Sequence, residues 1–129
     1  MAEFVDEFYR TWSGPYPFSS EAIQVHAPEE TGVYQVLRVA ESGLNRVYVG
    51  IVAAESGDRT IKGRLLEHFN GTGNSELARR RGEHDLAFAF CRCDGMTARQ
   101  LESHMLVHGM PEFNKRRERT NYIPNITVH

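Results

Sequence analysis

The stretch from residue 32 to residue 52, GVYQVLRVAESGLNRVYVGIV, decides the fold of this chain. It contains two apolar runs, Val33 to Ala40 and Arg46 to Val52, with the alternation that is typical of strands. The segment between them, Glu41 to Asn45, has the polar, glycine-containing composition of a hairpin loop. The stretch therefore predicts an antiparallel pair of strands.

Each run contributes one tyrosine, Tyr34 or Tyr48, on the less apolar parity of its strand. We therefore expect both tyrosines on the same face of the sheet. A third strand is predicted over Asp85 to Cys93, where both parities are apolar, as in a central strand covered on both faces. With the helices described next, these strands predict an α+β fold with a small three-stranded antiparallel sheet flanked by helices.

Three helices are predicted after the hairpin, over residues 61–69, 75–81 and 97–108. Asp58 or Thr60 is available to cap the first of them. Thr97 to Gln100 has the spacing of a capping box at the start of the third, and Gly109 and Pro111 would end it.

The region before the hairpin predicts helix as well. Residues 1–12 could form a short amphipathic helix, which the glycine and two prolines of residues 13–17 would end. A second short helix is predicted over residues 21–26. We therefore expect residues 1–30 to be a helical extension packed on a domain that spans residues 31–129.

The composition predicts one domain, since the chain has 129 residues and 40% of them are hydrophobic. Glu3, Asp6 and Glu7 interrupt the apolar residues near the start before they reach the length of a signal peptide or membrane span. We therefore expect a cytoplasmic protein that does not contact the membrane. Cys91 and Cys93, expected on opposite faces of their strand, are interpreted as small core residues in a reducing compartment.

Positive charge gathers in the C-terminal part of the chain. Residues 58–129 hold twelve Lys and Arg against nine Asp and Glu, whereas residues 1–57 hold three against eight. The basic clusters are of the kind that neutralises phosphates, although a solvated helix face and a charged tail would look the same. The candidate contacts to nucleic acid are Lys62, Arg79, Arg80, Arg81, Lys115, Arg116 and Arg117.

Two predicted helices carry polar residues at their apolar stripe. Arg64 and His68 border the stripe of the first, and Glu102 falls in the middle of the stripe of the third. A carboxylate among apolar residues is costly unless a metal ion or a paired cation compensates it, so a metal site and an ion pair with an arginine both stay open. His104 and His108, four residues apart, are interpreted as solvent-facing rather than as a metal pair.

The chemistry-bearing residues follow one another in a recognisable order. They are Gly32-Val33-Tyr34, Tyr48-Val49-Gly50, Arg64 with His68, Glu102, and Asn114 after Phe113. This ordered set resembles the GIY-YIG nuclease family over roughly residues 31 to 115. The spacing of its arginine, histidine, glutamate and asparagine is similar to that of the restriction endonuclease branch. Valine stands for isoleucine in both tripeptides, a change of one methylene.

The resemblance implies a phosphodiester hydrolase with a divalent metal ion. Glu102 is the only carboxylate of the set, and a hard oxygen ligand of this kind suits Mg²⁺ or Mn²⁺. The planar guanidinium of Arg64 would hold the scissile phosphate through two hydrogen bonds.

The remaining residues of the set would handle the attacking water and the substrate. Tyr34 is expected to act as general base or to orient the water, with His68 relaying the proton. Tyr48 would hydrogen-bond a phosphate oxygen or the water. Asn114 would hold its loop against the active site or help to position a phosphate.

We therefore predict an endonuclease with a one-metal mechanism, with DNA favoured over RNA as the substrate. One catalytic site cuts one strand, so cleavage of both strands would require two binding events or a homodimer. Two other functions fit the same scaffold. One is a nucleic-acid-binding module without turnover, and the other is a protein-interaction domain in which Glu102 is merely ion-paired.

Overall fold

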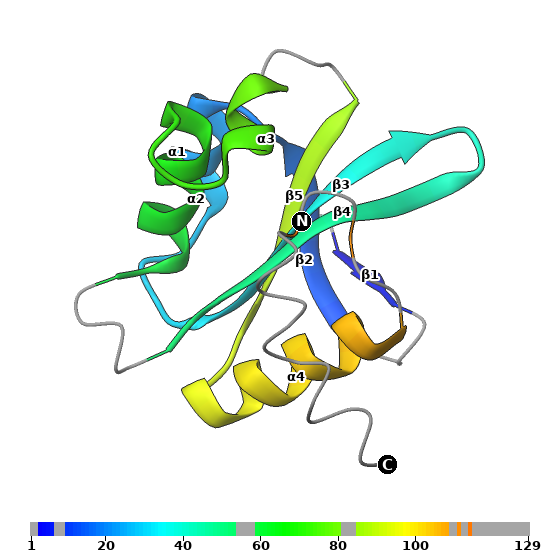
Figure 1. Cartoon of the computed structure of the whole chain (residues 1–129), viewed down its shortest axis with the longest axis vertical. Coiled ribbons are helices and arrows are strands. Elements are labelled where there is room, and N and C mark those ends of the chain that lie inside the picture. The colour runs from blue at the N-terminus through cyan, green and yellow to red at the C-terminus, as the bar shows by residue number, and fades with distance from the viewer. Residues whose placement is uncertain are drawn as a thin grey trace.

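A computed structural model describes residues 3–6, 10–53, 59–80, 85–108, 111 and 114. These residues form one antiparallel sheet in the order β1-β2-β5-β3-β4, flanked by helices (Figure 1). The strands are β1 (Glu3–Val5), β2 (Thr11–Pro17), β3 (Gly32–Ala40), β4 (Gly43–Val52) and β5 (Leu86–Arg92). The helices are α1 (Ser20–His26), α2 (Ile61–Asn70), α3 (Ser75–Arg79) and α4 (Gly95–His108).

The predicted hairpin is confirmed, since β3 and β4 pair antiparallel along their whole length. The turn is shorter than the predicted loop over residues 41–45, because β4 already begins at Gly43 and pairs it with Ala40. A bulge near the middle places Val36 opposite Tyr48 but Leu37 opposite Arg46, so Val47 is the extra residue.

The α+β class is confirmed, but the prediction of three strands is wrong because the described residues form five. Strand β5 lies between β2 and β3, and residues 86–90 are buried, as predicted for a central strand. The two unpredicted strands, β1 and β2, pair with each other and extend the sheet beyond β5.

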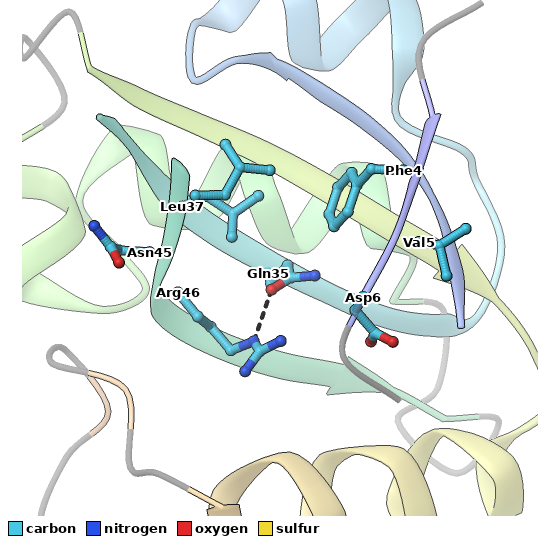
Figure 2. A pocket seen from close by; sticks show the side chains of 8 residues that line it. Phe4, Val5, Asp6, Gln35, Leu37, Asn45 and Arg46 are labelled. Carbon is cyan, nitrogen blue, oxygen red and sulfur yellow. Dashed lines mark hydrogen bonds between the residues drawn. The ribbon is translucent and has the colours of Figure 1, made fainter. Parts of the chain in front are cut away.

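The helix predicted over residues 1–12 is wrong, since the chain there forms β1 and the start of β2. The aromatic residues explain the strands: Trp12 is fully buried, its indole N–H donates to Asp6 Oδ2 at 2.8 Å, and Phe4 stacks on it at 6.5 Å between ring centroids. The ring of Phe4 lies on the same face of the sheet as Leu37 (Figure 2). The prolines of β2 lie beyond its pairing with β1, where the missing N–H costs no ladder bond to that strand.

The helix predicted over residues 21–26 is confirmed as α1, and α2 follows the prediction with Thr60 as its cap. Asp58, the alternative cap, lies outside the described residues. Helix α4 begins before the expected cap Thr97, because Asp94 Oδ1 accepts the Thr97 N–H at 2.8 Å and acts as the cap instead. This contact lowers the pKa of Asp94.

The sheet separates two hydrophobic clusters. Helices α1, α2 and α3 cover one face, where Ile23, Leu65 and Leu77 pack with the side chains of Tyr34 and Tyr48. Helix α4 covers the other face (Figure 1). The expectation of opposite faces for the two cysteines is wrong.

Both Cys91 and Cys93 pack against the α4-side cluster, because residues two apart in an extended chain point the same way. They are free thiols, and burial is the main cause that raises the pKa of each, that of Cys93 to about 11. None of the helices in the described residues has the length and apolar character needed to cross a membrane.

Candidate active site

Tyr34 and Tyr48 lie on the same face of the sheet, as predicted, with ring centroids 6.3 Å apart. His68 of α2 completes a buried aromatic cluster, at 5.7 Å from the ring of Tyr34 and 4.9 Å from that of Tyr48. The Tyr34 hydroxyl and His68 Nε2 are 2.8 Å apart. The prediction that His68 borders the apolar stripe understated its burial, since its side chain is fully enclosed.

Gly50 makes room for the Tyr34 side chain. It lies opposite Tyr34 in the register of β3 and β4, and a Cβ atom built on Gly50 would overlap the hydroxyl and ring carbons of Tyr34. The glycine of the second tripeptide is therefore required by the tyrosine of the first. This contact links the two tripeptides physically.

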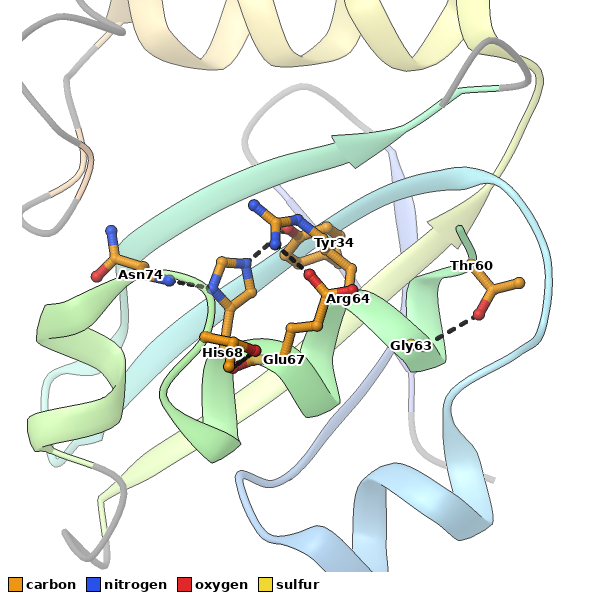
Figure 3. Close-up of polar contacts among 8 residues, drawn as sticks. Tyr34, Thr60, Gly63, Arg64, Glu67, His68 and Asn74 are labelled. Carbon is orange, nitrogen blue, oxygen red and sulfur yellow. Dashed lines mark hydrogen bonds and ion pairs between the residues drawn. The ribbon is translucent and has the colours of Figure 1, made fainter. Parts of the chain in front are cut away.

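The loop after α2 determines which nitrogen of His68 carries the proton. The backbone N–H of Asn74 donates to His68 Nδ1 at 2.7 Å, so Nδ1 is an acceptor and carries no proton (Figure 3). We therefore assign the proton to Nε2, which donates to the Tyr34 oxygen. Gly73 lies against the imidazole next to Nδ1, where a Cβ atom would overlap the ring.

This tautomer is incompatible with the proton relay that the sequence suggested. Nε2 already holds a proton and Nδ1 faces a backbone donor, so His68 has no site that can accept the Tyr34 proton. The geometry instead makes His68 a donor to the Tyr34 oxygen, which favours negative charge on that oxygen.

Burial dominates the acid–base behaviour of Tyr34. Its desolvation raises the pKa of Tyr34 well above the ordinary value, and the nearby hydroxyl of Tyr48 and carboxylate of Glu102 act in the same direction. The positive charge of Arg64 lowers it. Cationic charge at the site is therefore what Tyr34 needs before it can serve as a base.

Arg64 is half-buried beside the tyrosines, and its Nη1 lies 2.6 Å from Glu67 Oε1 (Figure 3). Burial alone would lower the pKa of Arg64, but Tyr34 and Glu67 outweigh it and the net pKa is raised. Glu67 is a carboxylate that the sequence analysis missed. Its i,i+3 spacing from Arg64 on a predicted helix was the available signal.

Glu102 is 8% exposed, which confirms the burial predicted from the helical period. Its charge acts on Tyr34 although Glu102 lies on α4 and Tyr34 on β3. The described residues contain no group of three or more His, Cys, Asp and Glu side chains placed to share a metal ion. As a single carboxylate, Glu102 suits a divalent cation that retains several waters and takes substrate phosphate oxygens as further ligands.

Asn114 anchors the segment after α4 to strand β4. Its side-chain oxygen accepts the Val49 N–H at 3.0 Å, and its Nδ2 donates to the Val49 oxygen at 3.0 Å. The amide thus pairs with the outer edge of β4 as a neighbouring strand would, between Tyr48 and Gly50 in the sequence. This supports the anchoring role that was predicted as one of two for Asn114.

Three of the predicted basic contacts lie among the described residues. Arg79 and Arg80 lie on α3 and at its end, near Glu76 at 2.7 and 3.8 Å, and Lys62 is half-buried on α2. The predicted contacts outside the described residues are Arg81, Lys115, Arg116 and Arg117. His104 is exposed, as predicted.

The raised pKa of Tyr34 predicts that stability falls at alkaline pH. The folded chain keeps this proton above about pH 10, the ordinary tyrosine pKa, where the unfolded chain loses it. Below pH 10 both states keep the proton, and the free energy of unfolding is undiminished. Above pH 10 the folded state binds more protons than the unfolded state, so the free energy of unfolding decreases, by at most about 1.4 kcal/mol per pH unit for one group.

Urea unfolding of wild type and Tyr34→Phe, from pH 8 to the highest pH at which both still fold, measures this effect. The free energy of unfolding should decrease less steeply with pH in the variant. Tyr16→Phe, which changes a half-buried tyrosine on β2, is the control. An equally steep decrease in Tyr34→Phe would contradict the assignment.

Two tyrosines on neighbouring antiparallel strands, facing a helix with Arg64 and His68, define the fold of a GIY-YIG endonuclease domain. The chain is similar to the GIY-YIG N-terminal endonuclease domain of UvrC from Thermotoga maritima, in two point mutants bound to the catalytic divalent cation. Identity is 23%, and the match covers 74% of this chain and 98% of that domain, with TM-scores of 0.52 and 0.50. This likeness shows the fold. No family model and no curated protein matches the chain.

Proposed function

We propose that this chain is a metal-dependent endonuclease of the GIY-YIG family, on the restriction endonuclease branch, which hydrolyses phosphodiester bonds in DNA. The observation that carries the proposal is the buried hydrogen bond between Tyr34 and His68, which lie 34 residues apart in sequence. A tyrosine held by a histidine N–H, beside a half-buried arginine, is suited to a water and a phosphate rather than to packing alone.

Each residue of the cluster has a part in this proposal. After it has lost its own proton to solvent, Tyr34 orients the attacking water and takes the proton of that water, and the His68 N–H stabilises the Tyr34 phenolate until this transfer neutralises it. Tyr48 donates to a phosphate oxygen or to the water. Arg64 uses some of its N–H donors for the scissile phosphate and others for Glu67, since a guanidinium has enough donors for both.

Glu102 would hold the metal ion of a one-metal mechanism. A bound Mg²⁺ or Mn²⁺ would supply charge stabilisation on the phosphoryl oxygens and the departing oxygen. The chain itself keeps Glu102 buried and within electrostatic reach of Tyr34. Glu102 would therefore hold a cation whose positive charge lowers the pKa of the nearby base Tyr34.

The test is incubation of the full chain with supercoiled plasmid, with and without Mg²⁺. We expect nicked circles that depend on the metal and disappear with a chelator, since one site cuts one strand. Linear product with second-order dependence on protein concentration would support a homodimer. The same assay on single-stranded and duplex RNA decides between the two nucleic acids.

The two other functions give different results in this assay. Metal-independent binding of the plasmid without nicking would indicate a silent nucleic-acid-binding module. Neither binding nor nicking on any substrate would overturn the nuclease proposal and favour a protein-interaction module.

Replacement of His68 separates its role as a donor from a role in packing. We expect His68→Gln, whose amide nitrogen can donate to Tyr34, to retain about a tenth of the nicking rate. His68→Ala should lose about a hundredfold or more, since it removes the donor. Both rates are measured at saturating Mg²⁺, and equal rates for the two variants would show that the donor does not matter.

A further inference from the structure

A second concave site lies on the opposite face of the sheet from the tyrosines. It has a volume of about 490 Å³ and lies between β1 and the hairpin of β3 and β4 (Figure 2). Its lining residues are Phe4, Val5, Asp6, Gln35, Leu37, Leu44, Asn45 and Arg46. Pockets of this size hold small organic ligands, and a mixture of apolar walls and a few polar groups is typical of them.

The polar centre of this pocket is Gln35, which is fully buried on β3. Its Oε1 accepts from Arg46 Nε at 2.8 Å. Because a guanidinium can only donate, the oxygen must face Arg46 and the amide nitrogen must point the other way. That nitrogen points to the space beside Phe4 and Asp6 (Figure 2), and within the described part of the chain it has no hydrogen-bond partner.

A buried N–H without a partner is costly, so the position of Gln35 indicates a ligand atom that accepts from it. Asp6 lies on the far side of the same space. Its oxygens accept from the Trp12 indole and the Arg10 backbone at 2.8 and 2.9 Å, and a carboxylate oxygen can accept more than one hydrogen bond. The pocket thus offers a donor and an acceptor toward the same ligand.

The walls of the pocket favour a flat ligand. The Phe4 ring stacks on Trp12 and lies on the same side of the pocket as Leu37. Aromatic faces bind planar rings well. A ring whose edge carries a hydrogen-bond acceptor next to an N–H would satisfy Gln35 and Asp6 together. Each nucleobase has such an edge: O6 and N1–H in guanine, O4 and N3–H in uracil and thymine, N1 and N6–H in adenine, and N3 and N4–H in cytosine.

We propose that this pocket binds an unpaired nucleobase through a hydrogen-bond acceptor and an N–H that lie side by side on its edge. The choice of a nucleobase among ligands with such an edge depends on the proposed nuclease function. Strand β4 is an edge of the sheet in the described residues, and it carries Arg46 toward the pocket and Tyr48 toward the opposite face. A single strand that crosses this edge beside Arg46, before the contact of Asn114 with Val49, would place a base in the pocket and a phosphate on the side of the tyrosines.

The test follows the ¹⁵N-labelled chain by NMR while mononucleotides are added. Trp12 is the single tryptophan of the chain, and its indole N–H donates to Asp6, so its signal reports on the pocket. We expect saturable shifts of the Trp12 indole and Gln35 amide signals with GMP and UMP, with a dissociation constant on the order of 1 mM. AMP and CMP should cause the same shifts, because each carries an acceptor next to an N–H on the edge of its base.

Two variants probe the pocket separately. Gln35→Leu keeps the size of the side chain but removes the donor, and should weaken GMP binding about tenfold. Phe4→Ala removes the flat wall, and keeps the proposal testable if Gln35→Leu does not fold. N-methylacetamide, an amide without a ring, should cause no saturable shift. If it matched GMP, the pocket would be a site for peptide groups and the proposal would be wrong.

The outcome is independent of catalysis. Glu102→Gln should bind GMP as wild type does, because Glu102 does not line the pocket. Nucleotide binding in a chain that never nicks DNA would contradict the nuclease proposal and leave the pocket standing. Nicking without any shift of the Trp12 or Gln35 signals at about 10 mM nucleotide would overturn the pocket alone.

Discussion

Glu102→Gln is expected to lower the rate of Mg²⁺-dependent DNA cleavage by about a thousandfold or more. Gln keeps the size and polarity of Glu102, which is 8% exposed, and removes only the negative charge. A neutral amide is a poor ligand for a hard cation, so the site would lose the metal ion. Without that positive charge the buried Tyr34 hydroxyl also keeps its proton, since desolvation already raises its pKa.

The measurement is a single-turnover nicking rate at several Mg²⁺ concentrations, with enzyme in excess. Glu41→Gln, at an exposed position in the turn of the hairpin, is the matched control and should cleave as wild type does. Thermal unfolding should show that both variants fold. A Glu102→Gln rate close to wild type at all Mg²⁺ concentrations would remove Glu102 from the metal site.

Gly50→Ala is expected to damage both stability and cleavage, because its Cβ atom would occupy the space of the Tyr34 hydroxyl and ring. Tyr34 lies in the fully buried cluster, so the ring can move only by displacing its neighbours. We expect the free energy of unfolding to fall by about 1–3 kcal/mol, as for other overpacked cores. Loss of the contact to His68 should lower the nicking rate by about a hundredfold or more.

Urea unfolding and the nicking rate measure the two effects on the same preparation. Gly63→Ala is the control, since Gly63 lies in α2 and a Cβ atom there would come 3.2 Å from Thr60 Oγ1. Alanine is favoured over glycine in a helix by about 1 kcal/mol, which offsets a small shift of Thr60. If Gly50→Ala cleaved DNA at the wild-type rate, Tyr34 would not need its position against His68.

The elements with a clear period were predictable from the sequence. Alternation placed Tyr34 and Tyr48 on one face of a hairpin, and the 3.6-residue period placed Glu102 among buried residues. The first residues were not predictable in this way. Trp12 and Phe4 fit a helical spacing as well as a strand, and only pairing of β2 with β5 decides between the two.

Some features of the candidate site were also predictable from the sequence, and others were not. The order of Tyr34, Arg64, His68 and Glu102 pointed to a nuclease before any contact was known. The direction of the hydrogen bond between Tyr34 and His68 was not predictable, because it depends on the backbone N–H of Asn74. The pocket around Gln35 also had no sequence signal, since Phe4 and Arg46 are distant in the chain and line one pocket only in the folded structure.

The sequence by itself therefore determined the strands of the β3–β4 hairpin, the central strand β5 and the buried sides of α2 and α4, because side-chain direction follows local backbone periods. The tertiary structure alone decided the protonation of His68, the need for glycine at Gly50 and the unpartnered amide of Gln35. These features arise where strands and helices that are distant in the chain meet. Hydrogen bonding and packing at such contacts depend on distances of a few tenths of an ångström, which no residue pattern contains.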